Sequence, residues 1–169
     1  MVLDRILKKL EDSKIFKEWY QDNENYYLVH AFLMIDPQVK QTWQIGYYGK
    51  KRDKIITFDV GDEILQNPES EVFKNSGIVK QLDLKKVKVD YKKAMNIAEK
   101  FAKQHYPNYS IGKKIVILQN LDKQVWNITF ISNSFETLNI KINAEDGKVF
   151  YHNLTKIFSF DQGCKDNNS

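Results

Sequence analysis

The stretch VWNITFISNSFETLNIKINAEDGKVFY, residues 125–151, carries the strongest secondary-structure signal in the sequence. Apolar residues alternate with polar ones in two successive runs, a period of two that is typical of strands with one buried face. Asp146-Gly147 supplies the positive φ that a tight hairpin turn needs. The alternating apolar residues are Trp126, Ile128 and Phe130 in the first run and Leu138, Ile140 and Ile142 in the second. We therefore expect three consecutive antiparallel strands, the last of which runs from Lys148 to His152.

A sheet of this kind has one apolar face, which is not stable in water without a cover. The segment just upstream, residues 91–105, has helical periodicity, with Asp90 placed to cap its N-terminus and Tyr106-Pro107 placed to end it. Its apolar face consists of Ala94, Ile97, Ala98, Phe101 and Ala102. The sequence therefore predicts that this helix covers the three strands.

The first half of the chain has a similar order of signals. Leu3, Ile6, Leu7 and Leu10 recur at helical spacing, and an apolar helical face continues to Tyr20. Residues 26–35 then form a strand that is apolar on both faces, which predicts burial on both sides. Further strands are expected from Trp43 to Tyr48 and over residues 55–60.

The two halves match in order, and QTWQIGYYG around Trp43 aligns with QVWNITFIS around Trp126. The predicted fold class is α+β, with two repeated units of a helix packed on an antiparallel β-meander, PepSY-like or cystatin-like, in one compact body. The predicted division is residues 1–84 for the first unit, 85–160 for the second and 161–169 for a disordered tail. The first strand of the second unit, Lys114 to Leu118, is also apolar on both faces. The second apolar face of each first strand predicts that the two units bury surface against each other. Trp43 and Trp126 are expected to be core anchors rather than ligand stackers.

The segment from Val87 to His152 resembles the PepSY domain family, and the first half is a divergent copy in this interpretation. The family pattern is an alanine-rich helix, a Trp-led strand and a strand that ends in a hairpin of the form (I/V)DA-x-(T/D)-G-x-V. The matching positions are Ala94, Ala98, Trp126, Ile142, Asn143, Ala144, Gly147 and Val149. Asn143 stands where the family usually has Asp, a departure that affects the turn. The resemblance implies a binding or regulatory module, in some cases associated with peptidases, without catalytic residues.

Composition and charge narrow the class of protein and of partner. Among 169 residues the net charge is +4, and nearly all cations are Lys because Arg5 and Arg52 are the only arginines. Specific readers of nucleic acid rely on the Arg fork, so we expect no specific nucleic-acid partner. The N-terminus lacks the apolar core of a signal peptide, and no apolar run is long enough to span a membrane. Together with the single Cys164 in the polar tail, these features predict a cytoplasmic protein.

Few residues suggest chemistry. His30, His105 and His152 fall in different predicted elements, and neither they nor Cys164 show a metal-ligand or nucleophile pattern. We predict no catalytic, cofactor-binding or metal-binding residue and no cofactor. The candidate binding residues are the basic loop Lys50, Lys51, Arg52 and Lys54. A solvated hairpin tip is the plainer interpretation of this loop, and an anion or partner contact is the alternative.

Three hypotheses of function remain open. The first is a non-enzymatic module that binds an unidentified protein or peptide, for example through a sheet edge that accepts a further strand, and that modulates a peptidase. The second is a carrier or sensor with a small-ligand pocket between helix and sheet. The third is an enzyme with a cystatin-like fold, which would need inward-facing polar residues. The sequence leaves homodimer formation open.

Overall fold

The three strands expected in residues 125–151 are present and lie at one end of a larger sheet. They are β7 (Gln124–Ile131), β8 (Glu136–Asn143) and β9 (Val149–Lys156) in the computed structural model, which describes residues 2–71 and 78–156. Gly147 has φ 79°, and its N–H donates to the carbonyl of Asn143 at 2.9 Å. The predicted hairpin turn is therefore confirmed.

The remaining elements follow the order expected from the sequence, with two short additions. The N-terminal helices are α1 (Val2–Glu11) and α2 (Lys14–Gln21), and the strands after them are β1 (Tyr26–Ile35), β2 (Trp43–Gly49), β3 (Lys54–Val60), β4 (Ile64–Gln66) and β5 (Ser70–Glu71). A 3-10 turn (Leu84–Lys86) leads to α3 (Tyr91–His105) and β6 (Lys113–Asn120). The short strands β4 and β5 were not predicted, because three and two residues show no period.

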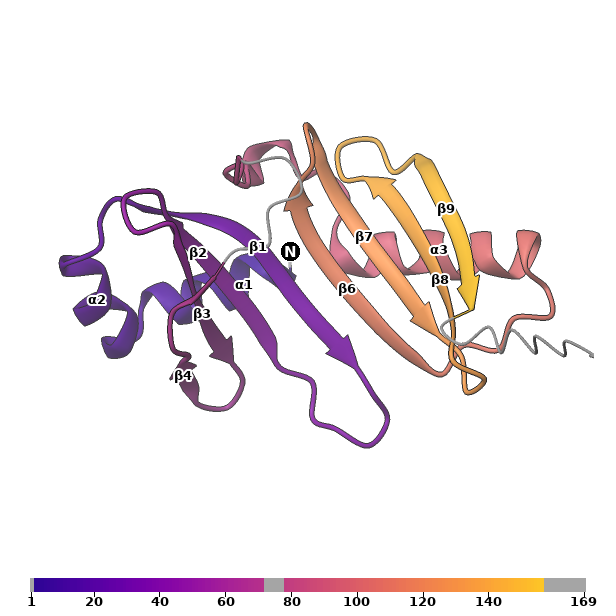
Figure 1. Cartoon of the computed structure of the whole chain (residues 1–169), viewed down its shortest axis with the longest axis horizontal. Helices are drawn as coiled ribbons and strands as arrows, with labels where there is room; N and C mark the ends of the chain where they lie inside the picture. The colour runs from indigo at the N-terminus through magenta and orange to yellow at the C-terminus, as the bar shows by residue number, and fades with distance from the viewer. Residues whose placement is uncertain (1, 72–77, 157–169) are drawn as a thin grey trace, which may run out of the picture.

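Within the described residues, all strands form one nine-stranded antiparallel sheet in the order β4-β3-β2-β1-β6-β7-β8-β9, with β5 also paired to β3. The pairing of β1 with β6, from His30 opposite Gln119 to Ile35 opposite Lys114, joins the two halves. The helices of both halves lie behind the same face of this sheet (Figure 1). The opposite side, which we call the open face, carries no helix.

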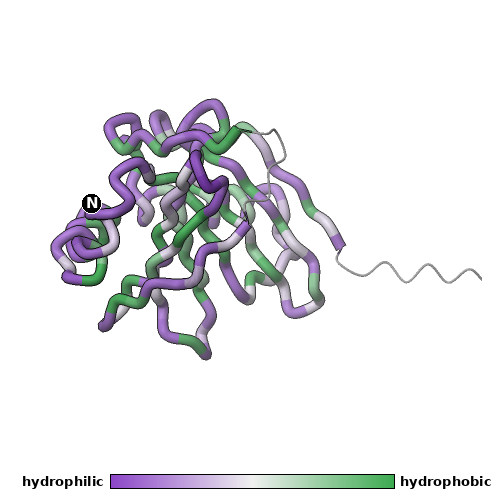
Figure 2. The backbone as a smooth tube through the Cα atoms, turned by 60° about the vertical axis from the view of Figure 1, so that its left-hand side comes forward, coloured by the Kyte–Doolittle hydropathy of each residue, from purple (hydrophilic) through white to green (hydrophobic). Residues whose placement is uncertain are grey.

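The core lies between the helices and the sheet. Leu3, Leu7 and Leu10 of α1 are buried there, and α3 contributes the small side chains of Ala94, Ala98 and Ala102. Small residues on the covering helix let its backbone approach the strands closely. Figure 2 shows that hydrophobic residues recur along the strands in the interior, while the chain between them is largely hydrophilic. The α+β class and the compact body are thus confirmed.

The two tryptophans occupy matching places in the sheet, as core anchors. Trp43 opens β2 and Trp126 lies in β7, so each stands one strand away from the central pair β1 and β6. Tyr91, at the start of α3, contacts both rings, with centroid distances of 5.4 Å to Trp43 and 6.3 Å to Trp126. The Trp126 Nε1 donates to the carbonyl of Val89 at 2.8 Å. The first turn of α3 therefore packs against side chains of both halves.

The prediction that β1 is buried on both sides is wrong. Met34 is 43% exposed and Phe32 is half-buried, and both point to the open face. The halves do not bury their second apolar faces against each other. They meet edge to edge through backbone hydrogen bonds between β1 and β6, which leaves those second faces side by side on the side of the sheet that carries no helix.

The sheet continues across the boundary predicted at residues 84 and 85. The predicted tail of residues 161–169, with Cys164, lies outside the described residues. No helix in the described ranges is long and apolar enough to cross a membrane.

Candidate functional site

The predicted basic loop forms the tip of the β2–β3 hairpin, and half of its charge is paired within the chain. Arg52 Nη2 lies 2.9 Å from Glu69 Oε2, and Lys54 pairs with Glu71 of β5. The hydroxyl of Tyr26 also donates to Glu69, at 3.1 Å. Arg52 and Lys54 therefore brace the segment that follows β4. A contact with an anion or partner is left to the exposed Lys50 and Lys51.

His30 and the other two histidines have different surroundings. The His30 ring lies over Gly46 of β2 on the open face, where a Cβ atom added to Gly46 would come within 2.2 Å of the ring. Burial lowers the pKa of His30 to about 4. His30 is therefore neutral at pH 7 and lacks a second titratable group to form a catalytic pair among its paired neighbours, Gly46 and Gln119.

This burial predicts a pH-dependent stability. The folded-state pKa of His30 is below its unfolded value of 6.5, so the unfolded chain binds the proton more tightly, and stability falls as pH drops from 6.5 towards 4. We expect the free energy of unfolding to be about 2 kcal/mol lower at pH 5 than at pH 7.5, measured by urea denaturation. In His30→Gln, which keeps His105 and His152, this difference should shrink to under about 0.5 kcal/mol. An unchanged slope in the variant would contradict the assignment to His30.

The structure brings together His105 and His152, which the sequence separates. Phe101 and His105 of α3, Tyr106 after it and His152 of β9 form one cluster, which we call the histidine cluster. The Phe101 ring stacks on His105 at 4.0 Å and lies 4.9 Å from the ring of His152. The Tyr106 hydroxyl is 2.5 Å from His152 Nδ1. The signal that could have found this contact is the register, because His152 pairs with the core-facing Ile140.

The histidine cluster lacks the number of ligand side chains that a metal centre needs. Across residues 2–71 and 78–156, no group of three or more His, Cys, Asp or Glu side chains could hold a metal ion. The rings instead fill the space between the end of α3 and β9. They position the β9 strand against the helix by aromatic contacts.

A hollow of about 310 Å³ adjoins the histidine cluster, between the C-terminal end of α3 and the last strands. Its lining residues are His105, Tyr106, Pro107, Asn108, Tyr109, Glu136 and Leu154. The Tyr109 hydroxyl lies 2.8 Å from the carbonyl oxygen of Phe130 and 2.7 Å from that of Glu136, and burial raises the pKa of Tyr109. The Glu136 carboxylate is 3.8 Å from Lys156 Nζ. The hollow thus combines aromatic walls with one carboxylate.

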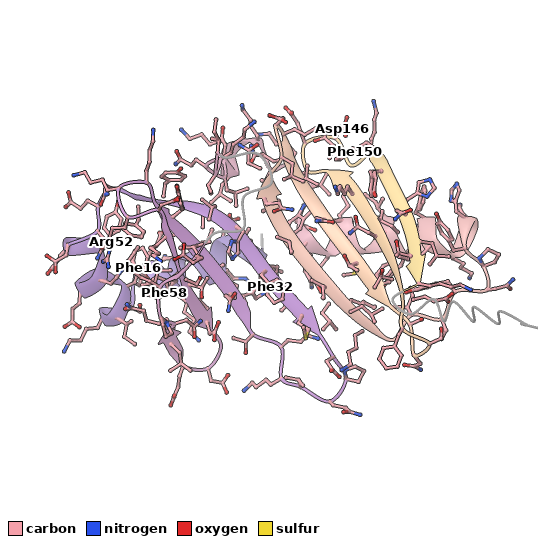
Figure 3. The ribbon with its side chains drawn as sticks, in the orientation of Figure 1. Phe16, Phe32, Arg52, Phe58, Asp146 and Phe150 are labelled. Carbon is pink, nitrogen blue, oxygen red and sulfur yellow. The ribbon has the colours of Figure 1, made fainter. Side chains whose placement is uncertain are left out.

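The outer edge of β9 borders this hollow. Within the described residues β9 pairs only with β8, and seven of its eight residues are exposed, in contrast to the strands inside the sheet. Phe150, Tyr151 and Leu154 are exposed by 43%, 41% and 40%. Lys123 Nζ lies 3.7 Å from the centre of the Phe150 ring. Figure 3 shows Phe150 and Asp146 where the chain turns into this edge strand.

The hydrogen-bonding direction of β9 follows from β8. The Asn143 N–H donates to Lys148, so alternate residues of β8 (Lys141, Asn139 and Thr137) direct their backbone groups towards β9. Their partners are Tyr151, Asn153 and Thr155. The backbone groups of His152, Leu154 and Lys156 therefore point outwards, away from the sheet. The opposite edge of the sheet has fewer outward-pointing backbone groups in a row, because β4 has only three residues and β5 covers part of β3.

Comparison with known proteins gives a fold but no family. No protein-family model matches the chain. No curated protein matches it either. The crystal structure of a "putative lipoprotein" from Clostridium difficile 630 is similar to it, with a TM-score of 0.55 and 15% sequence identity over 83% of this chain and 90% of that one. At this identity the similarity shows the fold alone.

Proposed function

We propose that this protein is a non-enzymatic binding module of two PepSY-like units that captures an extended protein or peptide segment along β9. The observation that carries the proposal is the exposed eight-residue edge strand with outward backbone groups at His152, Leu154 and Lys156. Such an edge binds an added strand through main-chain hydrogen bonds. Long exposed edges are normally protected by charge, proline or a cover, and β9 carries one charged residue, Lys156, at its end.

The side chains around β9 provide the selectivity that main-chain bonding lacks. On the helix side, His152 and Leu154 flank the hollow with Tyr106 and Glu136. On the open face, Tyr151 lies beneath Lys141, whose Nζ is 4.5 Å from the ring centre. Alternate side chains of an added strand point to opposite faces. We therefore expect an aromatic or aliphatic anchor that enters the hollow.

The internal packing of the second half favours the edge over a small-ligand pocket beneath α3. A pocket between helix and sheet in the second half would need space beneath α3. The side chains there are fully buried and belong to one hydrophobic core: Trp126, Ile128, Phe130, Leu138, Ile140 and Ile142. In the second half, this packing supports a binding surface on the outside of the molecule. The first half does have a hollow of about 400 Å³ between α2 and the sheet, lined by Phe16, Tyr20 and Tyr47 among others, and a carrier or sensor function would have to use that hollow.

The same reasoning applies to an enzyme with a cystatin-like fold. Asp59 lines a hollow of about 260 Å³, but that hollow lies on the open face beside Phe32, Met34 and Val39. The Asp59 carboxylate accepts a hydrogen bond from Gln44 Nε2 at 2.9 Å. The other charged lining residue, Lys40, pairs with Asp62. Both charged residues of the lining are therefore engaged with other side chains of the chain, which supports a non-enzymatic role.

The order of elements supports the tandem interpretation. In each half the helix comes first and the strands follow, and the strand order of one half mirrors that of the other about the β1–β6 pair.

The PepSY resemblance adds modulation of a peptidase as the expected role. The cytoplasmic location stays a prediction. Because the structural neighbour is called a lipoprotein, partners should be sought in both soluble and membrane fractions.

The experiment is affinity purification of the tagged full chain from its own cell, with the partner identified by mass spectrometry. We expect one reproducible stoichiometric protein, and a peptidase would support regulation. Hydrogen exchange of the complex then locates the contact. The amides of His152, Leu154 and Lys156 should gain protection, whereas those of Tyr151, Asn153 and Thr155 are already bonded to β8. A complex that leaves the outward amides unprotected would rule out strand addition.

A proline at position 154 tests the edge directly. Leu154→Pro removes an outward N–H while leaving the bonds to β8 in place, so the fold should persist. We expect partner affinity to drop at least about tenfold, because one main-chain bond is lost and the ring obstructs the added strand. Leu154→Ala is the matched control: it removes the same side chain but keeps the N–H. Equal affinities for the two variants, measured by titration calorimetry, would contradict the proposal.

A further inference from the structure

The open face has an apolar centre where the two halves join. Phe32 and Met34 of β1 stand directly opposite Ile117 and Ile115 of β6. Met34 is 43% exposed, and the other three are half-buried, with no helix on this side (Figure 1). These four adjoining apolar side chains form a contiguous patch on a sheet face that carries no helix, and such a patch is a candidate interaction surface. The far end of the face is partly covered, because the Tyr27 hydroxyl donates to the carbonyl of Val79 there.

Charges on this face are divided between the halves. The carboxylates are Asp36 and Asp59 in the first half, and the amines are Lys113 and Lys141 in the second. Lys113 Nζ lies 2.7 Å from Asp36 Oδ2 beside the β1–β6 junction. Asp59 and Lys141 belong to β3 and β8, each the third strand from that junction. Among the residues of the strands, the face is therefore acidic on one side and basic on the other. Lys40, in the loop after β1, also lies on the acidic side, where it pairs with Asp62.

One row of residues crosses the six inner strands at the same level. The registers place Asp59, Gln44, Phe32, Ile117, Asn127 and Lys141 in that order from β3 to β8. A two-fold axis along the β1–β6 junction would reverse this row in a second copy. Phe32 then meets Ile117 of the second copy, Gln44 meets Asn127, and Asp59 meets Lys141. Every position finds a partner of matching chemistry.

We propose that two copies of this chain pack open face to open face about that axis and form a homodimer. An isologous contact needs a surface complementary to itself after the two-fold rotation, and the row meets this requirement at its apolar centre and at both charged ends. The next residues along the strands on this face also fit the two-fold rotation. Met34 would face Ile115 of the second copy, and Asp36 would face its Lys113. The same rotation brings Ile117 and Ile115 of the second copy onto Phe32 and Met34, two of the residues that line the hollow on the open face.

The geometry of packed sheets is compatible with these pairs. Face-to-face sheets cross at about 30°, and strands lie about 4.8 Å apart, so Asp59 sits about 12 Å from the axis. The crossing angle displaces the outermost pair by about 6 Å along the strand. A Lys side chain with four rotatable methylenes spans such an offset, whereas the central apolar pairs are hardly displaced.

The test is sedimentation velocity on the full chain over a range of concentrations at low and moderate salt. We expect a concentration-dependent dimer. Met34→Glu places a charge at the centre of the contact and should weaken dimerisation at least about 100-fold. Leu154→Glu is the matched control: residue 154 is almost equally exposed but lies on the helix side of β9. It should leave the dimer intact.

A charge exchange identifies the facing residues. Asp59→Lys places Lys against Lys141 at both ends of the dimer and should weaken it at least about tenfold, while Asp59→Lys with Lys141→Asp should restore it. A monomer at all concentrations overturns the proposal, as does a dimer insensitive to Met34→Glu. A dimer lost in Leu154→Pro but not in Met34→Glu would assign self-association to the β9 edge instead. The peptide-binding proposal uses that edge and stands or falls separately.

Discussion

Trp126→Ala is expected to lower the free energy of unfolding by about 4 kcal/mol, the largest effect of any single truncation in this chain. Trp126 has no exposed surface, and its indole fills the space between β7 and the start of α3. Truncation leaves a cavity that a sheet on one side and a helix on the other cannot close. It also removes the donor to the carbonyl of Val89. Urea denaturation followed by circular dichroism measures the loss.

Two controls divide that loss into packing and hydrogen bonding. Trp126→Phe keeps most of the ring but removes Nε1, so it should cost about 1–2 kcal/mol for the unpaired Val89 carbonyl. Trp43→Ala removes the corresponding ring of the first half, which is 7% exposed. Its cost should be smaller than that of Trp126→Ala. A loss below about 2 kcal/mol for Trp126→Ala would mean that the core collapses around the gap.

The helices and strands that were predicted correctly are those whose determining residues lie close together in the sequence. The strands around Trp126 and Ile140 were found because alternation and an Asp-Gly turn occur within a few residues of each other. The helix from Tyr91 to His105 was found because its cap and its apolar face are adjacent in the sequence. Periodicity and turn chemistry act over this range.

The pairing of β1 with β6 depends on a different kind of information. It joins residues such as Phe32 and Ile117, which no turn connects, and a two-faced apolar strand gives no indication of what lies next to it. The sequence therefore predicted face-to-face burial of the halves where the structure has edge-to-edge pairing. The error itself is informative, because the second apolar faces lie on the side of the sheet that carries no helix, and the proposed dimer would cover them.

The candidate site was only partly accessible from sequence. A sheet edge that accepts a further strand was expected, but that β9 forms an edge depends on the strand order. His105 was not linked to His152 because three strands lie between them in the sequence. The basic loop was located correctly as a hairpin tip. Its Arg52 and Lys54 were not foreseen as partners of Glu69 and Glu71, since those acids follow a segment without clear periodicity.

The second large effect is expected for Gly49→Val. Gly49 pairs with Tyr26 across β1 and β2, and the Tyr26 ring leans over it so closely that an added Cβ would lie 2.3 Å from a ring carbon. Tyr26 is buried, packs edge-on against Trp19 at 5.3 Å and donates to Glu69. A side chain at position 49 expels the ring from these contacts. We expect a loss of about 4 kcal/mol, from the lost burial and the lost hydrogen bond together.

Gly46→Val is the matched control, because Gly46 lies in the same strand beneath another ring, that of His30. His30 lies on the open face rather than in the core between helices and sheet, so the same substitution should cost less, about 2 kcal/mol. Adding Tyr26→Ala to Gly49→Val removes the clash, and the double variant should lose at least about 1.5 kcal/mol less than the sum of the single losses. Additive losses would show that Gly49 is needed for its backbone alone. Coupled losses would show that Gly49 is needed because it leaves space for the Tyr26 ring. That ring contacts Trp19 of α2, and its hydroxyl donates to Glu69.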